Sequence, residues 1–429
     1  MLSGDTIFAL SSGRPPAAVA IIRTSGPQAF VACEMIAGRL PAARQPALIT
    51  LRMPISGEEI DQALVLRFDG PKSVTGENVV EYQCHGSRAV IDALLGVLTS
   101  LSGMREAEPG EFTRRAFANG RIDLTEAEGL ADLLEAETES QRRVALLMAE
   151  GGLRKQIEAW RQTLVDLSAR AEAAIDYVGD EEETAADEHM LGWEAQELAA
   201  ELTLWLARPR AEPLREGVRV VVAGPPNSGK SSLVNALAEA EKAIVTDVAG
   251  TTRDAIEVPL AIAGIPIVLV DTAGLRESTD VVEAIGIDRA VGQMRRADLI
   301  LWLGEPESAP DPQNVIRVHG RTDLPGRGSV PEGSFAVSSV AGTGLTTLIQ
   351  KIVAEASAML PIEGELALNR RQAREIELAR DALAEANCTD LVRLAEGLRS
   401  ARSAFDRLSG YSGVEDVLDA LFGRFCLGK

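Results

Sequence analysis

A glycine-rich loop between a predicted strand and a predicted helix constrains this chain more than any other feature. Residues 224–231 read G-P-P-N-S-G-K-S and follow the β-branched run Val218–Ala223. In such a loop the glycines let backbone amides surround phosphate oxygens, Lys230 brings its charge to the β- and γ-phosphates, and Ser231 ligates Mg²⁺. The pattern therefore predicts a nucleoside triphosphate site on an α/β domain.

Six apolar runs that begin at this loop's strand alternate with helical segments, which predicts a doubly wound, mostly parallel sheet within residues 214–361. The predicted strands are residues 218–223, 255–261, 265–270, 298–302, 314–318 and 335–338. Helical periodicity precedes this block in residues 120–213 and follows it in residues 362–429. We therefore expect one helical domain, ending in F-C-L-G-K, into which the α/β domain is inserted.

Residues 1–119 have a mixed pattern, with strand-like runs at 17–22 and 63–68 and a helical period at 87–101, which predicts an α+β domain. In the helical region, Thr125 and Glu128 have the spacing of a capping box. The period then continues to Ile175 with a break at residues 151–152, which predicts two long helices. The remaining expectations here are a solvated acidic turn at 176–188, a helix at 193–207 and a linker with two prolines at 208–216.

Composition limits where the chain works and how it meets RNA. The formal net charge is −21, so there is no global basic field to hold a polyanion, and a local patch or a partner must supply any attraction to RNA. No apolar run reaches transmembrane length, and Met1–Leu10 lacks the pattern of a signal peptide. The four cysteines form no CxxC pair. We expect a cytoplasmic protein without a membrane partner.

Two further motifs favour a GTPase over an ATPase. Residues 271–274 read D-T-A-G after a buried run, where a carboxylate that holds Mg²⁺ through water and an amide that senses the γ-phosphate belong. Between this motif and the first loop, residues 246–254 contain Thr252, which can reach Mg²⁺ only in the triphosphate state. Leu275 occupies the place of a water-positioning glutamine, so hydrolysis needs another helper and another cation.

Guanine recognition departs from the usual N-K-x-D motif, because residues 320–323 read G-R-T-D. Asp323 keeps the acceptor for the guanine ring, Arg321 can stack its stem over the base, and Gly320 supplies no side-chain amide. The segment that begins at Ser338 is similar to the loop that offers a backbone amide to the guanine oxygen. The predicted GTP-binding residues are Asn227, Ser228, Gly229, Lys230, Ser231, Ser232, Thr246, Asp247, Val248, Ala249, Gly250, Thr251, Thr252, Asp271, Thr272, Ala273, Gly274, Asp323, Ser338, Ser339 and Val340.

These loops and several motifs at both ends resemble the MnmE (TrmE) family of tRNA modification GTPases, within the TrmE-Era-EngA-YihA-Septin-like GTPases. The resemblance covers essentially the whole chain. Its marks outside the nucleotide loops are D-T-I at 5–7, I-I-R-T-S-G at 21–26, T-G-E at 75–77, H-G at 85–86, P-G-E-F-T at 109–113, A-F-A-N-G at 116–120 and R-F-C-L-G-K at 424–429.

The resemblance implies an N-terminal folate-binding domain that dimerises, a helical domain and an inserted Ras-like P-loop G domain. It also implies a potassium-dependent GTP hydrolase that works in a heterotetramer with an FAD-dependent partner, MnmG. Together they add a carboxymethylaminomethyl or aminomethyl group to the 5-position of the wobble uridine in certain tRNAs, with 5,10-methylene-tetrahydrofolate as the one-carbon donor. The partner would carry the FAD and much of the tRNA contact.

The resemblance also implies roles for single residues. Asn227, Thr246, Val248 and Thr251 look like potassium ligands, and Glu283 looks like the acid that positions the attacking water. For tetrahydrofolate the family positions are Arg23, Glu81, Arg121 and Lys429, and Cys426 looks like a functionally required cysteine. Lys230, Glu283 and Cys426 are thus the catalytic candidates, with Ser231 and Thr252 for Mg²⁺.

Two other interpretations stay open at this point. A ribosome-assembly switch of the Era or Der type has similar nucleotide loops, but such proteins carry basic RNA-binding appendages, whereas this chain is acidic. A weaker alternative is a GTPase module whose folate site has decayed. Simpler roles also compete at single positions: Asn227 as a loop amide, Glu283 as a solvated helix charge and Cys426 as a buried small side chain.

Overall fold

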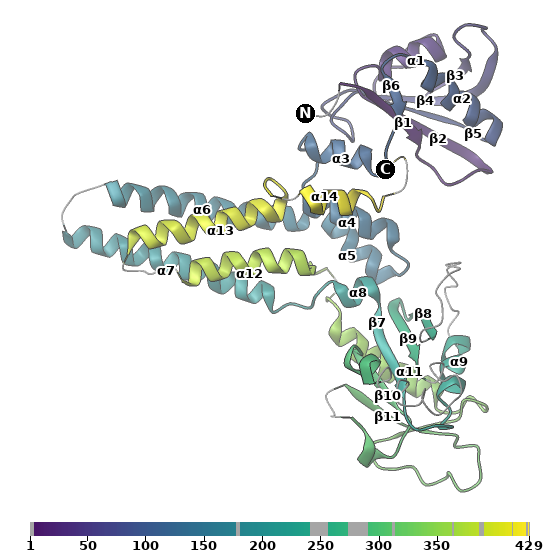
Figure 1. The fold of residues 1–429 in the computed structure, drawn as a ribbon, viewed down its shortest axis with the longest axis vertical. Helices are drawn as coiled ribbons and strands as arrows, with labels where there is room; N and C mark the ends of the chain where they lie inside the picture. Colours follow the sequence, from purple (N-terminus) through teal and green to yellow (C-terminus); the bar gives the residue numbers. More distant parts are fainter. Residues whose placement is uncertain are drawn as a thin grey trace, which may run out of the picture. The chain divides into compact units, whose positions relative to one another are not determined.

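The computed structural model describes residues 4–176, 181–240, 256–272, 291–310, 314–362, 364–385, 390–413, 415–425 and 428 (Figure 1). The chain divides into two compact units. Unit 1 contains Met1–Ala131, Ala149–Gln162 and Ser403–Lys429, and unit 2 contains Asp132–Met148 and Thr163–Arg402. The domain boundaries expected after residues 119, 213 and 361 remain a prediction. No helix among the described residues is both long enough and apolar enough to cross a membrane.

Unit 1 contains a six-stranded sheet in the order β3-β4-β5-β2-β1-β6. Neighbouring strands are antiparallel, except that β1 and β6 are parallel. Helices α1 and α2 share one apolar core with the strands, so the α+β prediction is confirmed. The bounds are β1 Thr6–Leu10, β2 Ala17–Ser25, α1 Ala29–Ala37, β3 Ala47–Arg52, β4 Glu59–Phe68, β5 Val79–Gly86, α2 Arg88–Ser100 and β6 Met104–Glu106.

The last helix of the chain packs onto the first helices that follow this sheet. Helix α3 is Glu111–Ala118, α4 is Leu124–Glu135 and α14 is Glu415–Phe422. The ring centroid of Phe422 lies 6.4 Å from that of Phe117. Gly110 has φ +70°, and a Cβ there would lie 2.4 Å from the carbonyl oxygen of Phe422, so only glycine permits this approach.

A buried arginine holds α3 against the sheet. Arg115 is fully buried, and its guanidinium donates to Asp5 Oδ1 at 2.9 Å, to Glu111 Oε1 at 3.0 Å and to both carboxylate oxygens of Glu77 at 3.2 Å. Arg105 also binds Asp5 and Glu111. Burial by itself raises the pKa of Glu111, but hydrogen bonds from Arg105, the Glu108 amide and Arg115 hold that pKa below its usual value.

Unit 2 contains a second six-stranded sheet, in the order β12-β11-β10-β7-β9-β8. All neighbours are parallel except the edge strand β8, which runs antiparallel to β9. The doubly wound, mostly parallel sheet is therefore confirmed. The bounds are β7 Val218–Ala223, α9 Lys230–Ala240, β8 Ile256–Ile262, β9 Ile265–Asp271, β10 Leu299–Trp302, β11 Val315–Gly320, β12 Phe335–Val337 and α11 Leu345–Met359.

The helices that precede this sheet differ from the prediction in number. The period up to Ile175 forms three helices, because α4 ends at Glu135, and α5 (Glu139–Ala149) and α6 (Gly152–Asp176) follow. A capping box that the prediction missed starts α5: the amide of Gln141 donates to Thr138 Oγ1, and the amide of Thr138 donates to Gln141 Oε1.

The capping box expected at Thr125 and Glu128 is wrong. The box at the start of α4 is formed by Asp123 and Glu126, whose carboxylates each accept the other's backbone N–H, at 2.9 and 2.8 Å. Thr125 lies inside the helix, where its hydroxyl donates to Asp123 Oδ1. Both patterns have the same spacing, and Asp123 is the preferred cap because a carboxylate accepts more strongly than a hydroxyl.

Two segments expected to be irregular are partly helical. Helix α7 spans Glu181–Leu206, so the second half of the acidic stretch belongs to its first turns rather than to a solvated turn. The expected linker contains the short helix α8, Glu212–Glu216, with Pro213 in its first turn, a position that proline tolerates.

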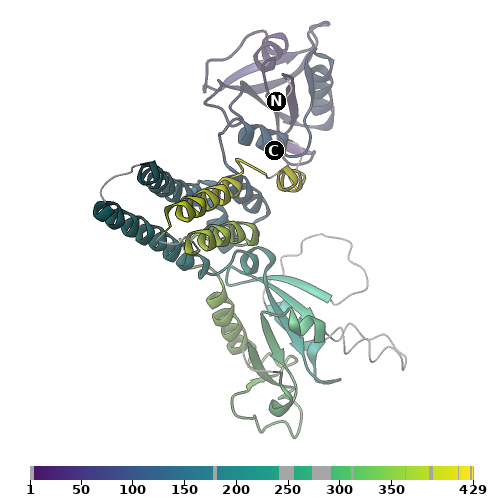
Figure 2. The ribbon, with the colours of Figure 1, turned by 60° about the vertical axis from the view of Figure 1, so that its left-hand side comes forward.

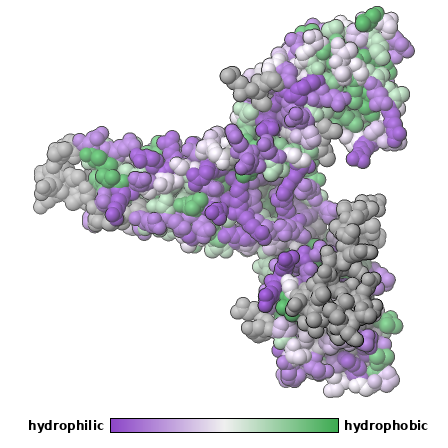
Figure 3. All heavy atoms as spheres, viewed as in Figure 1, coloured by the Kyte–Doolittle hydropathy of each residue, from purple (hydrophilic) through white to green (hydrophobic). Residues whose placement is uncertain are grey.

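The chain leaves the helices before β7 and returns to them after α11. These two connections lie side by side in unit 2. The Ala211 amide donates to the Leu368 carbonyl at 3.1 Å, and the Arg370 amide donates to Glu212 Oε1 at 2.6 Å. Helix α12 (Arg370–Ala384) then packs along α7, as both ribbon views show (Figure 1 and Figure 2), and α13 spans Leu391–Ser409. The visible surface of these helices is mostly hydrophilic (Figure 3). Neighbouring entry and exit connections are what an α/β domain inserted into a helical domain would have.

We expect Arg115→Met to lower the free energy of unfolding of unit 1 by about 3–5 kcal/mol, because Glu77 loses this guanidinium and Asp5 and Glu111 are left with Arg105. The neighbouring Arg114→Met is the control. Arg114 is 44% exposed and pairs with the exposed Asp419, so its loss should cost less than about 1 kcal/mol. Urea unfolding at pH 7 measures both, and equal costs would contradict the buried-charge argument.

The same network predicts a pH dependence. Folding lowers the pKa of Glu111 from about 4.5, so its ionised form adds stability above that value, and this contribution is lost as the pH falls through the lower folded-state pKa. We expect Glu111→Gln to flatten the acid limb of the stability curve. An unchanged acid limb would show that other carboxylates dominate it.

Candidate nucleotide site

The loop between β7 and α9 has a backbone that requires its glycines. Gly224 has φ +147°, and a Cβ there would lie 3.1–3.2 Å from Leu303 atoms. Gly229 has φ +98°, which side chains disfavour. Asn227 adopts φ +58°, a left-handed conformation that asparagine tolerates better than most residues. The sequence thus fixes a tight loop that ends at the first turn of a helix.

Lys230 begins α9 and lies under this loop. Its side chain is buried, and Nζ donates to the Gly224 carbonyl at 3.1 Å and to the Pro225 carbonyl at 2.8 Å. The cation, the loop amides and the positive end of the α9 dipole therefore converge on one place, which suits a phosphate anion.

Asp271 and Thr272 lie at the adjacent strand end. Asp271 pairs with Val222 across β7 and β9, and both Asp271 and Thr272 are buried. The Thr272 hydroxyl donates to the Val222 carbonyl at 2.8 Å. This is the carboxyl edge of a parallel sheet, where α/β proteins bind ligands. The carboxylate of Asp271 and the hydroxyl of Ser231, in the first turn of α9, are hard oxygen donors of the kind that Mg²⁺ binds.

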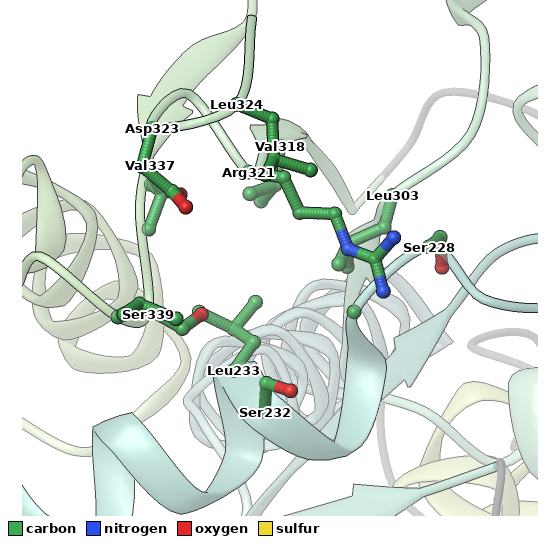
Figure 4. Close-up of a pocket in the computed structure, with 13 residues that line it drawn as sticks. Ser228, Ser232, Leu233, Leu303, Val318, Arg321, Asp323, Leu324, Val337 and Ser339 are labelled. Atoms are coloured by element: carbon green, nitrogen blue, oxygen red, sulfur yellow. The ribbon is translucent and has the colours of Figure 1, made fainter.

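A pocket of about 230 Å³ opens beside the loop (Figure 4). Its apolar lining comes from strands and from α9, including Leu233, Leu303 and Val337, and Arg321 reaches across it. The structure brings six predicted GTP-binding residues together in its lining: Ser228, Gly229, Ser232, Asp323, Ser339 and Val340. An apolar slot with few polar groups suits a flat purine ring.

Asp323 is held in place by a residue for which the sequence suggested another role. Ser338 is fully buried, and its hydroxyl donates to Asp323 Oδ1 at 2.6 Å while accepting the Ala341 amide at 3.0 Å. The hydrogen bond from Ser338, the backbone and the nearby charge of Arg321 lower the pKa of Asp323. Asp323 is therefore ionised at neutral pH and can accept hydrogen bonds from a base.

Gly320 leaves an unfilled space between the base pocket and the phosphate loop. A Cβ at this position would meet only Ser228 O at 3.5 Å and Leu303 Cδ2 at 3.7 Å, ordinary contact distances. The hydroxyl of Ser228 is buried and, among the residues that the structure describes, has no hydrogen-bond partner. Arg321 has φ +61°, and its Nε lies 3.4 Å from where a Cβ on Gly229 would stand. A side chain at position 320 therefore has room and an available partner.

Two of the four predicted folate positions lie side by side in the sheet of unit 1. Arg23 and Glu81 face each other across β2 and β5 and form an ion pair of 2.8 Å. Arg23 also pairs in register with Ala9 of β1. Just beyond the end of β1, the Ser11 hydroxyl donates to the carbonyl of Gly428 at 2.8 Å, which places the residue before Lys429 here.

Arg121 has a different partner. Its Nε donates to the carbonyl of Ser73 at 3.1 Å, and its stem lies beside Gly76. Among the described contacts none joins Arg121 to Arg23 or Glu81.

The other predicted site residues lie outside the described residues. They are Thr246, Asp247, Val248, Ala249, Gly250, Thr251, Thr252, Ala273, Gly274, Glu283, Cys426 and Lys429.

Comparison with known proteins decides the family. A family described as "MnmE helical domain" matches residues 124–426, and one described as "GTP-binding protein TrmE N-terminus" matches residues 6–121. The "tRNA modification GTPase MnmE" of Novosphingobium aromaticivorans is 50% identical over 439 residues, which cover 99% of this chain and 100% of that protein. The chain belongs to the MnmE family of tRNA modification GTPases.

Two other MnmE relatives agree over the same length. Those of Erythrobacter litoralis and Zymomonas mobilis are 50% and 49% identical, and each alignment covers 99% of this chain and 100% of the relative. Because the MnmE matches include the N-terminal and helical parts, they favour this family over an Era- or Der-like switch, with which only the G domain would be shared. The family prediction is confirmed.

We expect Gly320→Asn to bind GDP and GTP two- to twelve-fold more tightly, because one net hydrogen bond contributes about 0.5–1.5 kcal/mol. If the new amide binds the Ser228 hydroxyl, the gain should disappear in the double variant with Ser228→Ala. Titration with fluorescent nucleotides measures each step of this cycle. A gain that survives Ser228→Ala would show that the amide acts on the base instead.

We expect Asp323→Asn to let xanthosine nucleotides compete with guanosine nucleotides, because an amide can donate to the xanthine oxygen where the carboxylate can only accept. Adenosine diphosphate should stay a poor ligand of both proteins. An unchanged preference for guanosine diphosphate would show that Asp323 does not read the base.

Proposed function

We propose that this chain hydrolyses GTP to GDP and phosphate and couples the reaction to tRNA modification. The observation that carries the proposal is the ionised Asp323, held by Ser338 in an apolar pocket beside the loop of Lys230. Membership of the MnmE family supports the coupling to tRNA. The base-preference test of Asp323→Asn addresses the nucleotide directly.

Within this proposal the residues of the chain divide the work. Loop amides and Lys230 bind the phosphates, and the α9 N-terminus adds its dipole. Ser231, Asp271 and Thr252 are the residues to hold Mg²⁺, which when bound neutralises charge that develops on the phosphate oxygens. Asp323, Ser339 and Val340 orient the base.

We further propose that potassium assists hydrolysis. Asn227 stands at the turn of the phosphate loop with φ +58°, so its side chain projects from a fixed backbone. Thr246, Val248 and Thr251 are the remaining proposed ligands, and Glu283 is proposed to position the attacking water because Leu275 cannot. A bound monovalent cation would supply the positive charge that other GTPases take from an arginine.

We expect sodium in place of potassium to lower kcat for GTP by roughly 100-fold, the usual cost of removing one stabiliser of transition-state charge. Asn227→Ala should remove most of the difference between the two ions, whereas Ser228→Ala, one residue along the same loop, should preserve it. Phosphate release in matched chloride salts measures kcat. Equal rates of the unmodified protein in both salts would refute the potassium proposal.

We propose that unit 1 binds a tetrahydrofolate derivative near Arg23 and Glu81, with Lys429 and Cys426 brought there by the chain end. The contact of Gly428 with Ser11 supports this, since Lys429 follows directly. Arg121 is retained as a candidate from the resemblance. The domain division at residues 119, 213 and 361, a homodimer, a heterotetramer with the FAD-dependent MnmG and a cytoplasmic location complete the proposal.

Deletion of residues 426–429 should abolish modification of the wobble uridine and leave GTP hydrolysis within about twofold, because the tail contacts unit 1 whereas the nucleotide loops belong to unit 2. Mass analysis of tRNA from a deletion strain carrying the full or the shortened chain measures modification. Cys426→Ser separates the thiol from the rest of the tail. Loss of hydrolysis together with modification would indicate a structural role instead.

A further inference from the structure

A second pocket in unit 2 shares no lining residue with the base pocket. Its volume is about 630 Å³, and it lies where α8, the start of β7 and the first turns of α12 meet. Five arginines from separate parts of the chain line it: Arg210, Arg219, Arg296, Arg370 and Arg374. Such a gathering is unusual in a chain whose net charge is −21. We call it the junction pocket.

Two of these arginines have buried donors without partners. Within the described residues, Arg210 Nη1 and Arg219 Nε are buried and make no hydrogen bond, although Arg219 Nη2 donates to Glu257 at 2.8 Å and to Gln293 at 3.2 Å. A buried N–H of a charged group that lacks an acceptor is costly, and such groups are normally satisfied. An anion that enters this pocket could supply acceptors for such donors.

The other three arginines present their charge at the surface. Arg296 and Arg374 are exposed, and within the described part of the chain their guanidinium groups make no hydrogen bond or ion pair. The side chain of Arg370 is 83% exposed, and its Nε lies 3.9 Å from Glu212 Oε1. These long side chains can move to meet a ligand that enters the pocket.

Four carboxylates also line the pocket, but most of them are engaged. Glu212 accepts the backbone amide of Arg370, and Asp298 accepts the backbone amide of Arg219. Glu377 lies 3.6 Å from Arg380 on the same helix. Glu216 is exposed at the rim. Two of the four carboxylates therefore bind backbone amides of the junction, and the guanidinium groups of Arg296 and Arg374 stay available for an anion.

We propose that the junction pocket binds backbone phosphates of RNA, a proposal that rests on the proposed role in tRNA modification. Guanidinium groups bind phosphate oxygens through paired, directional hydrogen bonds. Arginines spread over four segments suit several phosphates in a row better than one ion. Because an acidic chain repels RNA at long range, the contacts must be local and strong, as this pocket provides.

The experiment measures binding of a labelled, unmodified tRNA transcript to the full-length chain by fluorescence anisotropy over a range of salt concentrations. The variant is Arg296→Ala with Arg374→Ala. The matched control is Arg142→Ala with Arg393→Ala, which removes the same charge from side chains of unit 2 that are 49% and 73% exposed and lie outside the pocket. GTP hydrolysis without RNA is measured for every protein.

We expect the pocket variant to bind tRNA roughly 25- to 60-fold more weakly at about 0.1 M salt and to lower the slope of log K against log salt by about 1.4–1.8, since each lost phosphate contact removes about 0.7–0.9. The control should change affinity less than about threefold. Hydrolysis without RNA should be unchanged in both, because neither pair belongs to the nucleotide site.

Three outcomes would overturn the inference. If the variant and the control lose the same tRNA affinity, the loss is a general charge effect. If the original chain does not bind tRNA, RNA is not the ligand of the pocket. Stabilisation by inorganic phosphate of the original chain but not of the variant in a thermal melt, with tRNA affinity unaffected, would assign the pocket to a free anion. In each case intact GTP hydrolysis would leave the proposed function standing, whereas its absence in the unmodified chain would refute that function.

Discussion

The fully buried guanidinium of Arg115 is the interaction on which unit 1 depends. It joins Asp5 before β1, Glu77 between β4 and β5, and Glu111 at the start of α3. Glu111 is buried and Asp5 and Glu77 are partly buried, so losing this guanidinium would cost folding free energy. The network explains why the chain has D-T-I, T-G-E and P-G-E-F-T where it does: their acids are structural partners of one arginine. By fixing α3, it also places Phe112, whose ring centre is 5.7 Å from Cζ of Arg23.

How far the sequence predicted the fold depended on the range of the interactions involved. The strands of unit 2 followed from buried β-branched runs, whose burial on both faces needs no knowledge of partners. Helix ends were harder, because Asp123 and Thr125 offer competing caps with the same spacing, and only the stronger acceptor is used. The break before α5 rests on one Thr138–Gln141 pair inside a continuous apolar period, so periodicity alone could not reveal it.

In the nucleotide site, too, the sequence predicted what depends on local motifs and missed what depends on long-range contacts. Local motifs predicted Lys230, Asp271 and Asp323, because their roles follow from spacing along a strand–loop–helix unit. The hydroxyl of Ser338 could not be assigned to Asp323, since the two lie 15 residues apart and meet only after β11 and β12 pair. The sequence likewise indicated that any RNA contact must be local, but not where. The five arginines of the junction pocket become neighbours only when α8, β7, α12 and the segment before β10 pack together.

Strand β7 connects the two pockets of unit 2. Its first residues include Arg219, which lines the junction pocket, and its last residue, Ala223, leads into the phosphate loop. The strand is almost wholly buried and is paired on both sides, with β9 and with β10. Six residues span about 20 Å at 3.3 Å each.

If phosphate binding at one end of β7 shifts the affinity for nucleotide at the other end, the reverse effect must be equal in size, because linkage between two binding sites is reciprocal. RNA bound in the junction pocket would then act on GTP affinity by the same factor as GTP acts on RNA affinity.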